Sequence, residues 1–318
     1  MKKNTKKLLF FSSAALLGMY AYNRFVEETA AKKNMLPTEN GAYYPWNQGN
    51  IFYTKEGNGN PVLLIHDTNP ESSSLEWTKI TKRLKKDHTV YTIDLLGCGL
   101  SDKPGVSYTS YMYVQLITSF IKEVIKEKTD VVATNLTTPS VIMANHMDDT
   151  IIDKMLLINP ASMSLLDQSP WLKSKTKQTL INLPLVGTFI YNLMMNPKFI
   201  DKKFREIYYG KKHLISSKIE DAYYEAAHID NSRGKYLYSS LIGKFMNTNI
   251  RHAVKSCKKP IYLICSKEIK NNIKNVEEYS KYNSNVEITY ISGCKLYPQL
   301  ENPEKTYQVI TSILKKEL

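Results

Sequence analysis

Short apolar runs of strand type alternate with helical segments over the first half of this 318-residue chain. The run at 62–66 is almost continuously apolar, as expected of a strand that is buried on both faces of a sheet. Helical patterns over 75–84 and 108–126 lie between the strand patterns, and this order is typical of a parallel sheet wound by helices. The sequence therefore predicts an α/β fold with a mostly parallel sheet.

The alternation stops between residues 161 and 254, where helical patterns rich in Tyr, Met and Lys replace it. Strand patterns resume at 261–265 and 288–291, and a closing helical pattern follows. Strands on either side of the interruption still need each other as neighbours in one sheet. We therefore expect a core made of 34–160 and 255–318, with 161–254 as an inserted helical cap.

We expect the first 33 residues to form a membrane anchor and a linker. Four lysines precede an uncharged run from Leu8 to Asn23, and no run of small residues follows that would mark a cleavage site. An uncleaved anchor is therefore preferred over a cleaved signal peptide or a surface helix. Because a bilayer span needs about 20 residues, either Phe25 and Val26 extend the run or the helix inserts only partly. The leading lysines favour a cytosolic N-terminus, which would leave the folded domain outside the cell membrane.

The net charge of +13 remains +9 without the four leading lysines, so the folded part is also basic. A basic surface favours anionic surroundings such as lipid headgroups. No nucleic-acid recognition motif accompanies the charge, so no nucleic-acid partner is expected, and the sequence predicts no particular protein partner.

The four cysteines have no CxxC spacing, and no cofactor or metal site is expected. Cys265 and Cys294 end two strands expected to be neighbours, where buried thiols are preferred over a disulfide or a reactive thiol.

Three motifs carry a resemblance to a known family. Residues 93–104, IDLLGCGLSDKP, resemble the D-x-x-G-x-G-x-S-D-x-P turn of epoxide-hydrolase, dehalogenase and peroxidase-like proteins. Residues 63–67, LLIHD, are similar to their L-L-I-H-G strand end, and 291–303, ISGCKLYPQLENP, are similar to their G-x-G-H-x-P-x-x-E-x-P loop. The motifs occur in the family's order and cover about 49–316. The resemblance implies an α/β-hydrolase fold with an inserted helical cap.

The resemblance also places a catalytic nucleophile on a sharp turn after the strand at 131–134. Spacing to the next helix puts Thr137 at that position, whereas a one-turn-earlier register puts Asn135 there. Neither residue is serine, cysteine or aspartate, and a β-branched threonine costs about 1–3 kcal/mol in the strained backbone of such a turn. Thr138 precedes Pro139 and keeps the backbone N–H that an oxyanion hole requires.

The other catalytic positions of the resemblance are also altered. Leu296 stands where the family has its histidine, and leucine cannot transfer a proton. Glu268, or Ile269 in the alternative match, lies near the acid position, and Lys295 is a nonstandard candidate to serve Thr137. His66 lies near the expected pocket, where a structural role is preferred over a role as base. Asp67 replaces a glycine, and its carboxylate would repel the negative charge of an oxyanion.

We therefore expect a membrane-anchored pseudoenzyme that binds a small apolar or acyl-like ligand, or a protein partner, without standard Ser-His-Asp catalysis. The competing hypothesis is an active hydrolase of a small ester or amide that uses Thr137, Glu268 and Lys295. A purely structural anchor protein is the third alternative. Several cap residues are candidates to line a ligand pocket, although ordinary helix packing is the simpler interpretation: Trp171, Tyr191, Met194, Met195, Tyr223, Tyr224 and Tyr236.

Overall fold

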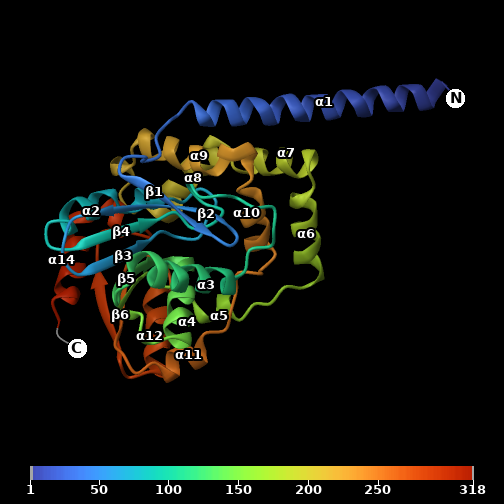
Figure 1. The fold of residues 1–318 in the computed structure, drawn as a ribbon. Helices are drawn as coiled ribbons and strands as arrows, with labels where there is room; N and C mark the ends of the chain where they lie inside the picture. The colour runs from blue at the N-terminus through green and yellow to red at the C-terminus, as the bar shows by residue number, and fades with distance from the viewer. Residues whose placement is uncertain (1–2, 317–318) are drawn as a thin grey trace.

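The computed structural model describes residues 3–316, and its centre is an eight-stranded sheet (Figure 1). The strand order is β1-β2-β4-β3-β5-β6-β7-β8. Strand β2 pairs antiparallel with β1 and β4, and all other neighbours pair parallel. The prediction of a mostly parallel α/β sheet is confirmed. The strands are β1 Gly41–Trp46, β2 Gly49–Glu56, β3 Pro61–Ile65, β4 Thr89–Ile93, β5 Thr129–Thr134, β6 Ile152–Ile158, β7 Ile261–Ser266 and β8 Val286–Ile291.

Helices cover both faces of the sheet because its central strands are apolar on both sides. In β3, Leu63 and Ile65 belong to one core layer, whereas Val62 and Leu64 belong to the other. The first layer includes residues of α3 Ser110–Phe120, α4 Thr138–Met147, α11 Arg251–Ser256 and α12 Asn272–Tyr282. The second includes residues of α2 Thr78–Leu84 and α14 Pro303–Leu314.

The chain leaves the sheet after β6 and returns to it at β7. Before α11, the intervening segment forms a group of helices that we call the cap: α5 Met163–Leu166, α6 Leu172–Asn182, α7 Leu185–Met194, α8 Pro197–Lys203, α9 Ser217–Ser232 and α10 Lys235–Ile242. Part of the cap packs over the loops that follow β3 and β8, since Phe204, Tyr208 and Tyr223 share a buried cluster with Tyr297. The short helix α13 Pro298–Glu301 follows Tyr297.

The N-terminal helix α1, Lys3–Ala31, is docked along its C-terminal part only. Val26 and Ala30 are buried against the cap, and the Tyr22 ring packs edge-on against Phe189 with the ring centroids 5.4 Å apart. The preceding part of α1 projects past α7 and away from the body (Figure 1), which leaves Phe10, Phe11, Leu16 and Leu17 exposed. One continuous helix thus has a docked half and a projecting half with exposed apolar side chains.

The sequence led us to expect a helix that spans a membrane. Within residues 3–316, no helix, α1 included, has both the length and the apolar character that a crossing requires.

The four cysteines are free: Cys98, Cys265 and Cys294 are buried, and Cys257 is partly buried. The Sγ of Cys294 instead lies 3.8 Å from the Oγ of Ser266.

Candidate functional site

Asn135 stands at the sharp turn between β5 and α4. We call this turn the elbow. The φ of Asn135 is 45°, the left-handed value expected at such a turn, whereas the φ of Thr137 is −82°. The register that placed Thr137 at the nucleophile position is therefore corrected, and the earlier register with Asn135 is the one that the backbone adopts. The physical reason is that asparagine tolerates a positive φ far better than a β-branched threonine does.

The two backbone N–H groups that face this elbow both donate to one carboxylate oxygen. Oδ1 of Asp67 accepts from the Leu136 N–H at 3.0 Å and from the Thr68 N–H at 2.8 Å. In the motif that the sequence resembles, an oxyanion hole is made by the N–H after the nucleophile and an N–H from the loop after β3. Leu136 and Thr68 correspond to those two positions, so in this protein the Asp67 carboxylate occupies the place that the motif assigns to an oxyanion.

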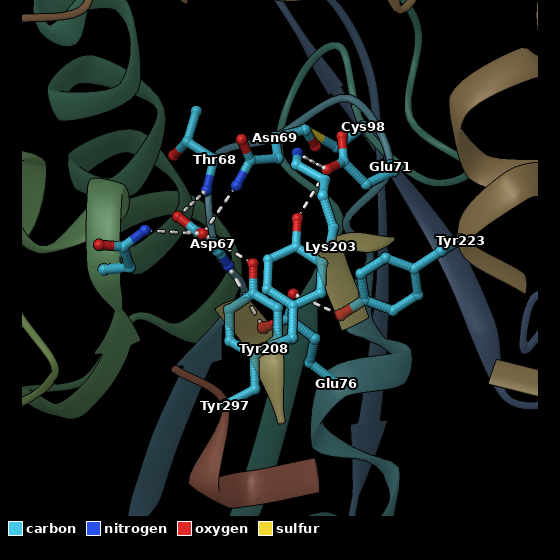
Figure 2. A network of polar contacts seen from close by, with 11 residues as sticks. Asp67, Thr68, Asn69, Glu71, Glu76, Cys98, Lys203, Tyr208, Tyr223 and Tyr297 are labelled. Carbon is cyan, nitrogen blue, oxygen red and sulfur yellow. Dashed lines mark hydrogen bonds and ion pairs between the residues drawn. The ribbon is translucent and has the colours of Figure 1, made fainter. Parts of the chain in front are cut away.

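The second oxygen of Asp67 is equally engaged. Oδ2 accepts from Asn69 Nδ2 at 2.7 Å, Asn135 Nδ2 at 3.0 Å and the Tyr297 hydroxyl at 2.8 Å. Figure 2 shows Asp67 at the centre of these contacts, with Thr68 and Asn69 on one side and Tyr297 on the other. Burial raises the pKa of Asp67, while the bonds from Asn135, Tyr297 and Leu136 lower it. Burial and repulsion from Glu71 outweigh these hydrogen bonds, so the pKa of Asp67 is raised overall.

The expected oxyanion donor Thr138 has another role. Its N–H bonds back to the Asn135 carbonyl within the 3₁₀ turn that joins β5 to α4. Thr138 is therefore a helix-start residue, and the donor position belongs to Leu136 because the elbow lies two residues earlier than the spacing predicted.

Thr137 and His66 form a closed hydrogen-bond system. The Thr137 Oγ1 donates to the His66 carbonyl at 2.7 Å and lies 2.6 Å from the Thr68 Oγ1. The His66 Nε2 accepts from the Leu95 N–H at 2.9 Å, so its Nδ1 carries the proton and donates to the Asp67 carbonyl at 2.7 Å. Burial lowers the pKa of His66, which keeps the ring neutral. His66 is thus a structural histidine, and Thr137 has hydroxyl and carbonyl partners in place of a base.

The remaining predicted catalytic residues are not brought to the elbow. The Lys295 Nζ donates to the Glu206 carbonyl in the cap at 2.8 Å. Glu268 is exposed, and its Oε1 accepts from the Gly293 N–H at 2.5 Å. Leu296 is partly buried and packs against the aromatic cluster of the cap. Within residues 3–316, the side chains of Thr137, Glu268 and Lys295 each bond to other groups, and no hydrogen bond joins any two of the three.

Asn159 fixes the loop that carries Leu296. It follows β6, and its Nδ2 donates to the Leu296 carbonyl at 2.9 Å and to the Ser266 Oγ at 3.0 Å. The adjacent Tyr297, which is not among the predicted site residues, is the loop residue that reaches Asp67. Its hydroxyl fits the site because the buried carboxylate needs a donor.

A second buried group joins the site to the cap. Lys203 of α8 forms an ion pair with Oε1 of Glu71, which also accepts from the Tyr208 hydroxyl at 2.7 Å (Figure 2). Burial raises the pKa of Glu71, but Lys203 and the hydrogen bonds outweigh burial and hold that pKa below its usual value. The second carboxylate oxygen of Glu71 is buried without a hydrogen-bond partner within residues 3–316.

Glu76 is a third buried acid beside Asp67. It accepts from the Tyr223 hydroxyl at 3.1 Å and from Gln299 Nε2 at 3.2 Å. Burial, followed by repulsion from Asp67, raises the pKa of Glu76 well above its usual value. The Tyr208 and Tyr297 rings lie with centroids 4.5 Å apart, and their hydroxyls donate to Glu71 and Asp67 respectively.

A small pocket remains between the elbow and the cap. Its volume is about 170 Å³. Polar side chains of the site line one part of it, and apolar cap side chains line the rest: Asn69, Glu71, Leu136, Leu165, Leu166, Lys203, Tyr238, Leu241, Met246 and Asn247. None of the cap residues named as pocket candidates from the sequence lines it. Of these, Tyr191, Met195, Tyr223 and Tyr224 are buried packing residues, whereas Trp171 and Met194 are exposed.

This chain is similar in sequence to known proteins over short stretches only. No family model matches the chain. Over 66 residues, 20% of each chain, it is 41% identical to a cis-3-alkyl-4-alkyloxetan-2-one decarboxylase of Shewanella oneidensis. Over 71 residues it is 32% identical to a 2-hydroxy-6-oxo-6-(2'-aminophenyl)hexa-2,4-dienoic acid hydrolase of Metapseudomonas resinovorans, covering 22% of this chain and 24% of the hydrolase. The chain thus matches less than a quarter of the length of these curated relatives.

Solved structures match much more of the chain. A bromoperoxidase from Bacillus anthracis superposes with a TM-score of 0.69 at 16% identity, over 87% of this chain and 100% of the bromoperoxidase. The chain is an α/β-hydrolase-fold protein. A bacterial membrane phospholipase A superposes with a TM-score of 0.67 at 16% identity, over 98% of this chain and 96% of the phospholipase. At 16% sequence identity, these two structures show that this α/β-hydrolase-fold protein shares their fold, and nothing more.

Sequence reasoning missed the partners that fill the site. Glu71, Lys203 and Tyr208 lie far apart in the sequence and outside the motifs, so no spacing connects them. A signal for Asp67 was present, because an acidic residue in place of glycine in LLIHD requires several donors nearby. Asn135 also carried a signal, since asparagine is among the few residues that favour a positive φ.

Proposed function

We propose that this α/β-hydrolase-fold protein is a membrane-associated, non-hydrolytic member of its fold that binds a small, largely apolar ligand between the elbow and the cap. The observation that carries the proposal is the position of Asp67. Its carboxylate accepts both N–H groups that would stabilise an oxyanion, at 2.8 and 3.0 Å. A substrate carbonyl would have to displace this carboxylate and then develop negative charge beside it.

The other two requirements for acyl transfer are also unmet at the elbow. Asn135 offers an amide where a nucleophile is required, and leucine replaces the histidine on the loop after β8. Loss of a single oxyanion donor costs about 10²–10³ in rate, and here both donors are occupied. The nucleophile and the base are lost in addition, and proton transfer by a positioned base contributes about 10²–10⁴.

The pocket supports the ligand part of the proposal. Leucine and methionine side chains from the cap line one part, and Glu71 and Lys203 line another. A volume of about 170 Å³ suits a molecule of a few heavy atoms or the end of a longer chain. Because Glu71 is ionised and one of its oxygens has no partner among residues 3–316, a hydroxyl or ammonium head is favoured over a carboxylate head.

The projecting half of α1 supports the membrane part. Phe10, Phe11 and Leu17 are each about two-thirds exposed, which is unfavourable for a helix surrounded by water. Partial insertion of this half into a bilayer would bury those side chains. The lysines before Leu8 favour a cytosolic N-terminus and an extracytoplasmic domain, and that topology remains a prediction.

A competing function is hydrolysis of a small ester or amide. The local similarity to the hydrolase of Metapseudomonas resinovorans favours this function. The test uses the purified full chain in detergent with a panel of short-chain aryl esters and amides. We expect no rate above buffer in the wild type. Turnover that Asn135→Ala and Asp67→Asn both abolish, while Ser312→Ala on α14 retains it, would contradict the proposal.

Ligand binding is tested separately by thermal unfolding in the presence of hexanol, hexylamine and hexanoate. We expect hexanol and hexylamine to raise the melting temperature more than hexanoate does, because ionised Glu71 repels a carboxylate. Met246→Trp fills the pocket and should remove the shift, whereas Leu214→Trp at an exposed site outside the pocket should retain it. Equal shifts for all three compounds, unaffected by Met246→Trp, would refute this part of the proposal.

A further inference from the structure

Helix α6 presents an unusual outer face. On its inner side Ser174, Gln178 and Ile181 are buried, as their spacing of four and three residues requires. On its outer side Leu172 is 80% exposed, and Leu180 and Leu183 are 46% and 43% exposed. Trp171, just before the helix, is 51% exposed. Large apolar side chains therefore line the part of the cap that faces solvent.

Lysines flank these apolar side chains. Lys173, Lys175 and Lys177 are exposed on α6, and no carboxylate within residues 3–316 lies at ion-pair distance from any of them. The Nζ of Lys173 and that of Lys244 lie 5.5 and 6.0 Å from the centre of the Trp171 ring. Tryptophan, leucine and lysine on one helix face are the combination found where helices lie in a membrane interface.

The sequence around α6 is free of acidic residues. No aspartate or glutamate occurs between Asp167 and Asp201, a stretch that carries four lysines. Asp167 itself is engaged by Arg251 on the core side. A surface of this kind is complementary to anionic headgroups and lacks the acidic side chains that would be repelled by them.

The position of α6 relative to α1 would bring this face of α6 close to a membrane bound by α1. Helices α6 and α7 form the end of the molecule past which the N-terminal half of α1 projects, and α6 runs crosswise to α1 there (Figure 1). A bilayer that takes up the projecting half of α1 would therefore meet α6 along its side.

We propose that the outer face of α6, with Trp171, is a second membrane-contact surface that binds anionic lipid headgroups and holds the cap against the bilayer. This inference rests on the proposed membrane association through α1. The lysines would neutralise phosphate groups while Trp171 and the exposed leucines enter the headgroup region. The pocket between elbow and cap would then be held at a fixed height above the lipid.

Trp171 makes the test specific to α6. The chain has three tryptophans, and Trp46 and Trp77 are 8% and 0% exposed, so brominated lipid in vesicles can quench only Trp171 strongly. The full chain is mixed with phosphatidylcholine vesicles with and without phosphatidylglycerol, and both pelleting and quenching are recorded. We expect a blue shift and quenching with anionic vesicles, and Trp171→Phe should remove both signals.

The charge variant is Lys173→Glu, Lys175→Glu, Lys177→Glu, and its control is Lys255→Glu, Lys258→Glu, Lys281→Glu at the α11–α12 end of the core. An anionic surface attracts each nearby lysine enough to change binding about fivefold, so the α6 variant should bind anionic vesicles at least about 100-fold more weakly. The control should bind as the wild type does. Thermal unfolding confirms that both variants are folded.

The outcomes separate the two claims. Pelleting without quenching of Trp171 would overturn the role of α6 and leave membrane association through α1 intact. No pelleting with either lipid mixture would overturn both. A blue shift that appears without vesicles and grows with protein concentration would show that a second copy of the chain covers α6, which also overturns the proposal.

Discussion

The carboxylate of Asp67 accepts a hydrogen bond from the Leu136 N–H at 3.0 Å, although the two residues lie 69 positions apart in the chain. This contact joins the end of β3 to the elbow after β5, two strands that are direct neighbours in the sheet. The protein thus satisfies with its own side chain the two backbone donors that an acyl-transfer site would keep for a substrate.

Asp67→Asn should destabilise the protein by about 2–5 kcal/mol, because an amide has one acceptor oxygen and cannot satisfy the five donors that bond to this buried carboxylate. Urea denaturation measures the change in the free energy of unfolding. Asp87→Asn, at an exposed site, should change it by less than about 0.5 kcal/mol. Equal effects of the two substitutions would mean that the Asp67 network contributes little to stability.

At the elbow, Asn135→Ala should be about 1 kcal/mol less stable than Asn135→Gly. Both variants lose the hydrogen bond to Asp67, so they differ mainly in how well they tolerate a φ of 45°. Chemical denaturation of the pair gives the difference directly. In the helical backbone at Ala144 the order should reverse, with Ala144→Gly less stable than the wild type. The same order at both positions would argue against a strained elbow.

The ion pair between Glu71 and Lys203 should show strong coupling. Lys203→Met leaves a buried carboxylate unpaired and should cost about 3–5 kcal/mol, whereas Glu71→Gln combined with Lys203→Met should recover most of the loss. A double-mutant cycle in urea measures the coupling free energy. Arg205→Met breaks an exposed pair with Asp201 and should cost less than about 1 kcal/mol. Additive effects in the cycle would contradict this prediction.

Acid should destabilise the protein partly through His228. Burial lowers the pKa of His228 from 6.5 to about 4, so the unfolded chain binds more protons between those two values. Stability contributed by the neutral ring is therefore present above about pH 6.5 and falls as the pH drops towards 4, by about 2–3 kcal/mol.

His228→Asn keeps a donor for the Tyr224 carbonyl and removes this titration. Its free energy of unfolding should fall less than that of the wild type between about pH 7 and 4.5. The raised pKa values of Asp67 and Glu76 act in the opposite direction, but they are common to both proteins and cancel in the comparison. His213→Asn, at an exposed site, should follow the wild-type curve, and an unchanged slope in His228→Asn would refute the role of His228.

The fold was predictable because its determinants are local. The continuous apolar pattern around 62–66 predicts a strand buried on both faces, and IDLLGCGLSDKP predicts a glycine turn after the next strand. Each conclusion depends on a few neighbouring residues, and the parallel sheet follows from their order along the chain. The absence of a histidine at Leu296 was equally evident, since only the identity of one residue in a motif was required.

The occupant of the site was decided by tertiary structure. The choice between Asn135 and Thr137 depends on where the backbone turns between β5 and α4, which the spacing of the motif alone left open. The partners of the Asp67 carboxylate come from three segments, the loop after β3, the elbow after β5 and the loop after β8, which only the folded sheet brings together. Glu71 meets Lys203 only because the cap folds back over the core. Sequence patterns record helix and strand periods, whereas the satisfaction of a buried carboxylate depends on distances between groups far apart along the chain.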